Sequence, residues 1–303
     1  MPPSAEALAL LRRLAPDDAL SLAAARRPFP LASPLAGTSR LLITGCGHSG
    51  THAVHAALRR HRLAASHEAL GADATVGWPF AAHGAAAADL WPFRNASLLL
   101  APHEPIFKLH RDPLFAVAAL ARGFTEDGRC IQRGYDGLSW ALAGRFVSLP
   151  EPKAAARWYS CLLEPRARLR LALHYWVKWN LLADKWAAAS FRVEALTFGR
   201  LAAVWCEYCA RAASCVPAAA RVCGAQGGDA ERVVGEARTG HNSTANPVTW
   251  GELLQVEPGM AIIARLLAED YGYTYPADPL LSPTKKLVGP RPKQASRTAD
   301  SGS

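Results

Sequence analysis

The sequence contains no long uninterrupted apolar run. No stretch of about 18 apolar residues free of charge, the least that a membrane-spanning helix needs, occurs in it, so we predict no membrane span. Residues 1–36 also lack the basic start and the continuous apolar core of a secretory signal peptide. These two absences favour the cytoplasm, but the sequence leaves the compartment open.

A basic stripe with interleaved aromatic residues is also missing. The formal net charge is +9, but the tail 282–303 alone holds five basic residues and one Asp. Because no basic stripe with interleaved aromatics appears outside that tail, we predict no nucleic-acid partner. The mild positive excess in the rest of the chain suits an anionic cofactor or substrate.

The cysteines lack the repeated spacing of a zinc site. Four of the seven are Cys206, Cys209, Cys215 and Cys223. Cys206-x-x-Cys209 is not followed by a second such pair, which argues against zinc, and we predict no metal. A disulfide among these four and ordinary reduced thiols remain open. The sequons at Asn95 and Asn242 matter only if the chain enters the secretory pathway.

The stretch Arg40 to Leu58 carries the strongest functional pattern. Leu41 to Ile43 is a short apolar run typical of a buried strand. Gly45 to Gly50 supply a loop with three glycines, and Ala53 to Leu58 favour a helix. A strand, a glycine loop and a helix in this order can hold a phosphate on backbone N–H groups at the helix N-terminus.

The same loop lacks the residues of a nucleotide hydrolase. Gly45 and Gly50 have the spacing of a Walker A loop, but Thr51 and His52 stand where Lys and Ser or Thr would contact the phosphates and the magnesium ion. This difference argues against a P-loop kinase. The pattern predicts a loop that holds a phosphate-like group, and a glycine-rich turn without a ligand is the alternative.

Two motifs resemble those of one enzyme family. His48-Ser49-Gly50-Thr51-His52 resembles the Lys/Arg-Ser-Gly-Thr-Thr loop of sulfotransferases, which bind 3′-phosphoadenosine 5′-phosphosulfate (PAPS) in a P-loop fold. Arg111-Asp112-Pro113, after an expected strand at 105–109, resembles the segment whose Arg grips the 3′-phosphate. The family usually has a Ser eight residues after that Arg, and this chain has Ala119. The resemblance covers about residues 38–275.

The resemblance implies an α/β fold with three layers around a central parallel sheet. We expect an N-terminal helix and linker at 1–36, a sulfotransferase-like P-loop domain at 37–281 and a disordered basic tail at 282–303. The resemblance further implies that PAPS is the co-substrate and that the acceptor is a hydroxyl group, with a carbohydrate as the favoured acceptor. The carbohydrate branch of the family gives the Golgi lumen as the alternative compartment.

The resemblance also assigns roles to individual residues. The expected cofactor contacts are Gly47, His48, Ser49, Gly50, Thr51, His52, Arg111 and Arg238. Glu68 stands twenty positions after His48, as the catalytic Glu does in several carbohydrate and protein-tyrosine sulfotransferases, and is expected to be the base. His67 is the adjacent substitute. His48 replaces the family's Lys or Arg and would act on the phosphosulfate when protonated.

The departures at His48 and Ala119 leave a second function open, a protein that keeps the nucleotide pocket but has lost turnover. Other segments give structural expectations only. We predict a short strand at 62–66, a loop and a helix at 73–90, and a helix at 201–215. A long helix at 166–189 would carry Trp176, Trp179 and Trp186 on one face, for core packing rather than for stacking on a sugar.

Overall fold

The computed structural model describes ten stretches of the chain. These are residues 5–24, 40–46, 49–67, 71–77, 103–122, 125–126, 129–130, 164–212, 217–224 and 246–276. The expected linker within 1–36 and the tail 282–303 lie outside them. Within the described residues, no helix has both the length and the apolar character needed to cross a membrane.

A five-stranded sheet forms the centre of the fold. Its order is β2 (Ala65–His67), β3 (Ala74–Val76), β1 (Arg40–Gly45), β4 (His103–His110) and β7 (Ala189–Arg192). Each neighbouring pair is parallel. The predicted α/β class with a parallel sheet is therefore confirmed. β5 (Thr125–Glu126) and β6 (Arg129–Cys130) pair separately as a small antiparallel hairpin.

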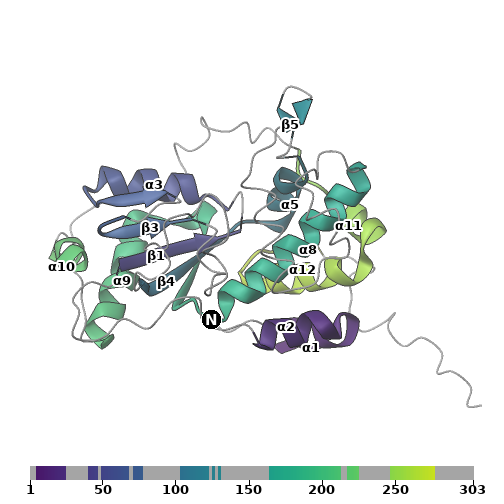
Figure 1. Cartoon of the computed structure of the whole chain (residues 1–303), viewed down its shortest axis with the longest axis horizontal. Coiled ribbons are helices and arrows are strands. Elements are labelled where there is room, and N and C mark those ends of the chain that lie inside the picture. Colours follow the sequence, from purple (N-terminus) through teal and green to yellow (C-terminus); the bar gives the residue numbers. More distant parts are fainter. Residues whose placement is uncertain are drawn as a thin grey trace, which may run out of the picture. The chain divides into compact units, whose positions relative to one another are not determined.

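Helices pack on both faces of the large sheet, because successive strand residues point to opposite sides. Leu41, Ile43 and Phe107 belong to the core shared with α3 (Thr51–Arg60), α9 (Phe198–Ala212) and α10 (Pro217–Gly224). Lys108, the residue after Phe107 in β4, points to the opposite face, where it contacts Asp184 of α8 (Pro165–Asp184). α8 in turn packs against α5 (Pro113–Arg122) and α12 (Pro258–Asp270), as Figure 1 shows.

The first and last helices of the described chain lie on the same side as α8. α1 (Ala5–Leu14) confirms the expected helix and packs against α12. A second helix that the sequence reading did not include, α2 (Pro16–Ala24), is held by Lys185, whose ammonium donates to the carbonyl oxygens of Leu22 and Ala23. α11 (Trp250–Val256) precedes α12 and begins with a capping box between Thr249 and Glu252.

The segment 73–90 was read wrongly at its start. Its alanines favoured a loop followed by a helix, but Ala74 to Val76 form β3, inserted between β2 and β1. All three residues of β3 are buried, and two are β-branched, so the strand gains from packing on both of its faces. The neighbouring strand β2 begins at Ala65, three residues later than the expected start at 62.

α8 ends five residues earlier than predicted, at Asp184. Trp176 and Trp179 lie on it with 0% and 1% of their surface exposed, so these two rings serve core packing. Trp186 lies in the turn after the helix and is only partly buried, so α8 carries two of the three predicted tryptophans. The Trp offsets indicated one face correctly for two rings only, because periodicity does not mark where a helix stops.

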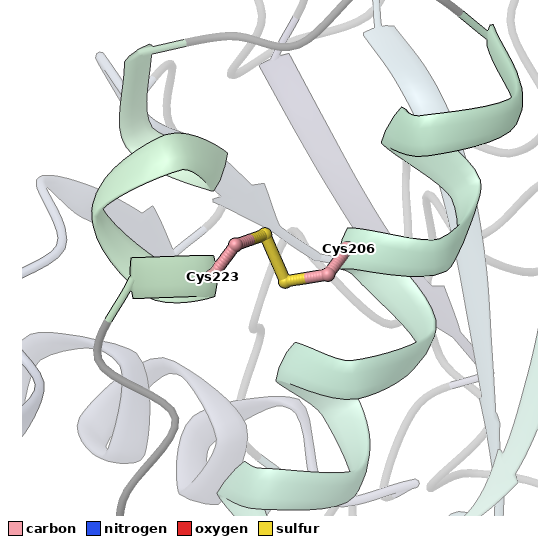
Figure 2. Close-up of a disulfide and its surroundings, with 2 residues drawn as sticks. All are labelled: Cys206 and Cys223. Carbon is pink, nitrogen blue, oxygen red and sulfur yellow. A yellow bond between two sulfur atoms is a disulfide. The ribbon is translucent and has the colours of Figure 1, made fainter.

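One disulfide joins the two helices that follow the sheet. Cys206 of α9 and Cys223 of α10 are bonded, with their Cα atoms 5.6 Å apart (Figure 2). This resolves the open alternative in favour of a disulfide for these two residues. Cys209 is buried and is not part of a disulfide, and Cys215 lies outside the described residues.

Candidate functional site

The loop after β1 depends on glycine at both of its ends. Gly50 has φ of 89°, a left-handed conformation that glycine adopts without steric cost, and it caps the start of α3. A Cβ on Gly50 would lie 2.4 Å from Cγ2 of Val193, and one on Gly45 would lie 2.8 Å from the carbonyl oxygen of Leu109. The loop is therefore seated closely on the ends of β4 and β7.

The N-terminus of α3 presents backbone N–H groups that have no acceptor within the helix. Its N-cap residue is Gly50, which has no side chain to cap it, and its first turn holds no acidic residue. In any α-helix the first N–H groups have no intrahelical partner and carry a partial positive charge, so an anion is favoured here. Within the described part of the chain, the Ser49 hydroxyl is fully buried and has no hydrogen-bond partner. Gly47 and His48 lie outside the described residues.

His67, the last residue of β2, contacts the first residue of α3. Its Nε2 lies 3.0 Å from Oγ1 of Thr51, and its ring stacks on that of His52 with 3.8 Å between centroids. Burial, together with the nearby His52 and His55, lowers the pKa of His67 to about 3. His67 is therefore a neutral, half-buried imidazole at the edge of the loop. The adjacent Glu68 lies outside the described residues.

Arg111 stands at the same edge of the sheet as the glycine loop. In the parallel register Gly45 pairs with Leu109, and Arg111 lies two residues beyond Leu109, directly after the end of β4. Asp112 fixes the turn into α5, because its Oδ1 accepts from the Leu114 N–H at 2.9 Å and its own N–H donates to Glu194 at 3.2 Å. The guanidinium of Arg111 lies 5.8 Å from the centroid of the Phe115 ring.

The strand order makes this edge a topological switch point. From β1 the chain moves to β2 on one side of the sheet, and from β4 it moves to β7 on the other side. In open parallel sheets, ligands bind in the crevice where neighbouring strands send their connections in opposite directions. The loop at 45–51 and Arg111 follow those two strands.

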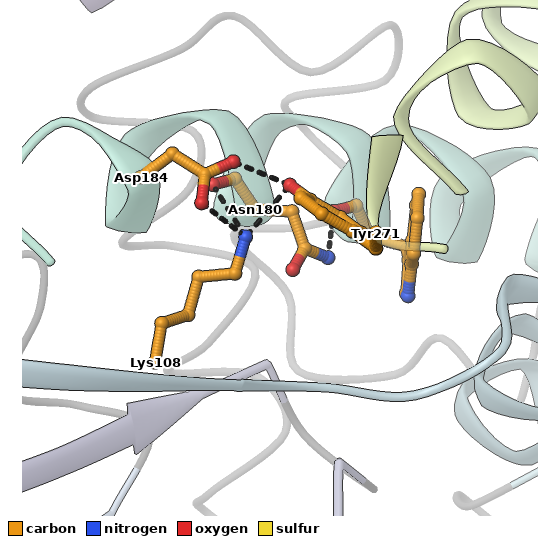
Figure 3. A network of polar contacts seen from close by, with 5 residues as sticks. Lys108, Asn180, Asp184 and Tyr271 are labelled. Atoms are coloured by element: carbon orange, nitrogen blue, oxygen red, sulfur yellow. Dashed lines mark hydrogen bonds and ion pairs between the residues drawn. The ribbon is translucent and has the colours of Figure 1, made fainter. Parts of the chain in front are cut away.

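A buried ionic network lies close to the beginning of the loop, and sequence reasoning missed it. Lys108 of β4 has no exposed surface, and its Nζ donates to Oδ1 of Asp184 at 2.5 Å and to the Tyr271 hydroxyl at 2.6 Å (Figure 3). Tyr271 also donates to the second carboxylate oxygen of Asp184. The network joins β4, α8 and the end of α12. A lysine within the apolar run of a buried strand was the signal in the sequence, since buried lysines need a partner.

Burial dominates the electrostatics of this network. It lowers the pKa of Lys108 to about 8 against the opposing effect of Asp184, and it raises the pKa of Tyr271. Burial also raises the pKa of the Cys46 thiol to about 12, against the effects of Lys108, a side-chain hydrogen bond with Asn180 and Arg111. Cys46 is the first residue after β1, so the charge of Lys108 acts on the beginning of the loop.

A second group of contacts holds the ends of β4 and β7 together. Glu194 accepts from the Tyr273 hydroxyl at 2.8 Å as well as from the Asp112 N–H. Arg192 donates to the carbonyl oxygen of Gly272 at 2.7 Å and lies over the Tyr273 ring. Through these contacts Arg192 and Glu194 hold the segment after α12 against the turn that carries Arg111.

The structure brings together only part of the expected site. Ser49, Gly50, Thr51, His52 and Arg111 are described, whereas Gly47, His48, Glu68 and Arg238 lie outside the described residues. In the described part of the chain, no group of three or more His, Cys, Asp or Glu residues is arranged to hold a metal ion. No protein-family model, curated protein or solved structure matches this sequence.

Proposed function

We propose that this protein is a PAPS-dependent sulfotransferase that acts on a hydroxyl group, with a carbohydrate as the favoured acceptor. The observation that carries the proposal is the convergence of the glycine loop, the uncapped N-terminus of α3 and Arg111 at one switch point of a parallel sheet. Support for the choice of donor comes from the two sequence motifs at 48–52 and 111–113.

In this proposal the chain holds both ends of the donor. N–H groups of residues 49–52 and the Thr51 hydroxyl bind the 5′-phosphosulfate, and Arg111 pairs with the 3′-phosphate. His48 and His52 contribute to the charge balance on the loop, with Gly47 as a further backbone contact. Arg238 is a further candidate contact to the 3′-phosphate.

The reaction transfers SO₃ to the acceptor oxygen. The bond between sulfur and the bridging oxygen of the phosphosulfate breaks, a new sulfur–oxygen bond forms on the acceptor, and adenosine 3′,5′-bisphosphate leaves. Glu68 accepts the proton of the acceptor hydroxyl. The enzyme's contribution is to position the two reactants and to place hydrogen-bond donors where negative charge develops on the leaving phosphate.

A second candidate function is nucleotide binding without turnover. His48 and Ala119 favour it, since each stands where the family usually has a residue that contacts the donor. A kinase activity is disfavoured, because Thr51 and His52 replace the residues that would contact ATP phosphates and magnesium.

Sulfate transfer from ³⁵S-labelled PAPS to a panel of carbohydrate, phenolic and peptide acceptors separates these functions. We expect labelled product from the wild-type chain and none from an Arg111→Ala variant at the same donor concentration. Binding of adenosine 3′,5′-bisphosphate without transfer to any acceptor would favour the binding protein. Magnesium-dependent consumption of ATP would instead favour the kinase.

A further inference from the structure

The contact between His67 and Thr51 joins two strand-to-helix units of the fold. His67 ends β2, Thr51 begins α3, and sixteen residues separate them in the sequence. Thr51 is 7% exposed. A buried threonine hydroxyl has one proton and can donate one hydrogen bond. Whether Nε2 of His67 carries a proton therefore decides where the hydroxyl proton of Thr51 points.

Two arrangements of a neutral imidazole are possible at this distance. With the proton on Nδ1, Nε2 accepts from the Thr51 hydroxyl, and that hydroxyl has no proton left for a ligand. With the proton on Nε2, His67 donates to Oγ1, and the hydroxyl proton of Thr51 is available to a third group. An oxyanion at the start of α3 requires a donor, so a bound anion selects the second arrangement.

The surroundings of His67 hold its ring in place. The ring of His52, the second residue of α3, stacks on it with an interplanar angle of 23°. His55, one turn further along the helix, lies 5.9 Å away between centroids and is itself fixed by a contact of its Nε2 with the carbonyl oxygen of Ala65 at 3.2 Å. The Ser49 hydroxyl, buried and without a partner within the described residues, is a second group near this helix start that a ligand would satisfy.

We infer that His67 is a positioning residue that donates from Nε2 to Thr51 and thereby directs the Thr51 hydroxyl proton to the phosphosulfate of the donor. The inference rests on the proposed function for the identity of that donor. The observed contact between His67 and Thr51 does not depend on which nucleotide binds. Any pyrophosphate-like anion at the N-terminus of α3 would need the same hydrogen bond from the Thr51 hydroxyl.

A double-mutant cycle read by calorimetry tests the inference, with adenosine 3′,5′-bisphosphate and inorganic pyrophosphate as the two probes. We expect Thr51→Val to weaken binding of both about tenfold and His67→Phe about fivefold. Combining the two should weaken binding no further than Thr51→Val alone, because His67 acts through that hydroxyl. His67→Gln, whose amide can donate from a similar position, should stay within about twofold of wild type.

A histidine at the other end of the same helix provides the matched control. His61 follows α3 and stacks on Phe198 with 3.5 Å between centroids. His61→Phe should leave both affinities unchanged. If His67→Phe does not fold, ¹⁵N NMR of the wild-type protein with bound pyrophosphate supplies the readout. A protonated Nε2 on His67 supports the inference, and a bare Nε2 overturns it.

The two probes separate failure of the inference from failure of the proposed function. Unchanged affinity in His67→Phe, or additive losses in the double variant, would overturn the role of His67 and leave the sulfotransferase proposal standing. Coupled losses for pyrophosphate in a protein that does not bind adenosine 3′,5′-bisphosphate would support the role of His67 and overturn the donor assignment. A wild-type protein that binds neither probe would overturn both.

Discussion

At the scale of single residues, Arg111 has both a described place in the fold and a proposed role, the contact with the 3′-phosphate. It follows the strand that pairs with the end of β1, and Asp112 and Glu194 fix the turn on which it stands. We expect Arg111→Ala to weaken binding of adenosine 3′,5′-bisphosphate by about 2–4 kcal/mol, the usual cost of losing a charge-assisted phosphate contact.

Calorimetry with two ligands checks this prediction. Inorganic pyrophosphate has no 3′-phosphate, so its affinity should not change in Arg111→Ala. Arg211→Ala serves as the control, because Arg211 is an exposed residue of α9 that pairs with Glu207 one turn away. Equal losses for both ligands would move Arg111 from the 3′-phosphate to the phosphosulfate end of the site.

Glu68 carries a separate prediction about the chemical step. If it is the base, Glu68→Gln should lower turnover about 10²- to 10⁴-fold and leave nucleotide affinity nearly unchanged, because the amide keeps the size of the side chain but cannot take up the proton. Transfer rates measured with labelled PAPS, alongside calorimetry on the same preparation, give both quantities. Full activity in the variant would remove the base role from Glu68.

At the scale of elements, the disulfide between α9 and α10 is the connection most open to a direct test. Cys206 and Cys223 are 17 residues apart in sequence, and a closed loop of that length restricts the unfolded chain by roughly 3 kcal/mol in the chain-entropy description. We expect a Cys206→Ser, Cys223→Ser variant to lose about that much stability in denaturant unfolding.

Reduction of the wild-type protein is the control for that variant. A reductant should lower the wild-type midpoint toward that of the double variant and leave the variant itself unchanged. Alkylation of protein from its native source should leave Cys206 and Cys223 unmodified until a reductant is added. Since such disulfides persist in oxidising compartments, prompt alkylation of both would instead favour a reducing one.

At the scale of the whole molecule, buried histidines link stability to pH. His110 is 2% exposed, and burial, with Lys108 and Arg192 nearby, lowers its pKa to about 2. The unfolded chain takes up a proton on this residue near its ordinary pKa of about 6.5, whereas the folded chain does not. Stability from this residue is therefore fully present above about pH 6.5 and falls as the pH falls.

The expected size follows from the same linkage. His110 should account for a loss of about 1.4 kcal/mol between pH 7.5 and 5.5, and the lowered pKa of His174, about 3, adds a loss of the same sign. Denaturant unfolding at a series of pH values measures the total. His110→Phe should remove part of the slope and keep the aromatic stack on Tyr271, whose centroid lies 4.4 Å away. A slope identical to that of the wild type would show that folding does not lower the pKa of His110.

The sequence by itself determined the elements whose signals are local. The apolar run before Gly45, the glycines Gly45 and Gly50, and Pro113 act through short-range sterics. The strands expected at 41–43 and 105–109 and the helix expected at 53–58 are found as β1, β4 and α3, and Pro113 begins α5. The tertiary structure decided what depends on distant partners. Ala74 to Val76 form a strand because they pair between β2 and β1, where the strand is buried on both faces.

The candidate site divides in the same way. The sequence predicted that the glycine loop and Arg111 would each follow a buried strand, and β1 and β4 precede them; the role of these residues as a site stays a prediction. His67 as a neighbour of Thr51, and Lys108 as the partner of Asp184 and Tyr271, were not, because 16 and up to 163 residues separate these groups along the chain. A single sequence contains no record of such pairings. Only the packing of α3, α8 and α12 around the sheet brings them together, because burial forces each polar group to find a partner.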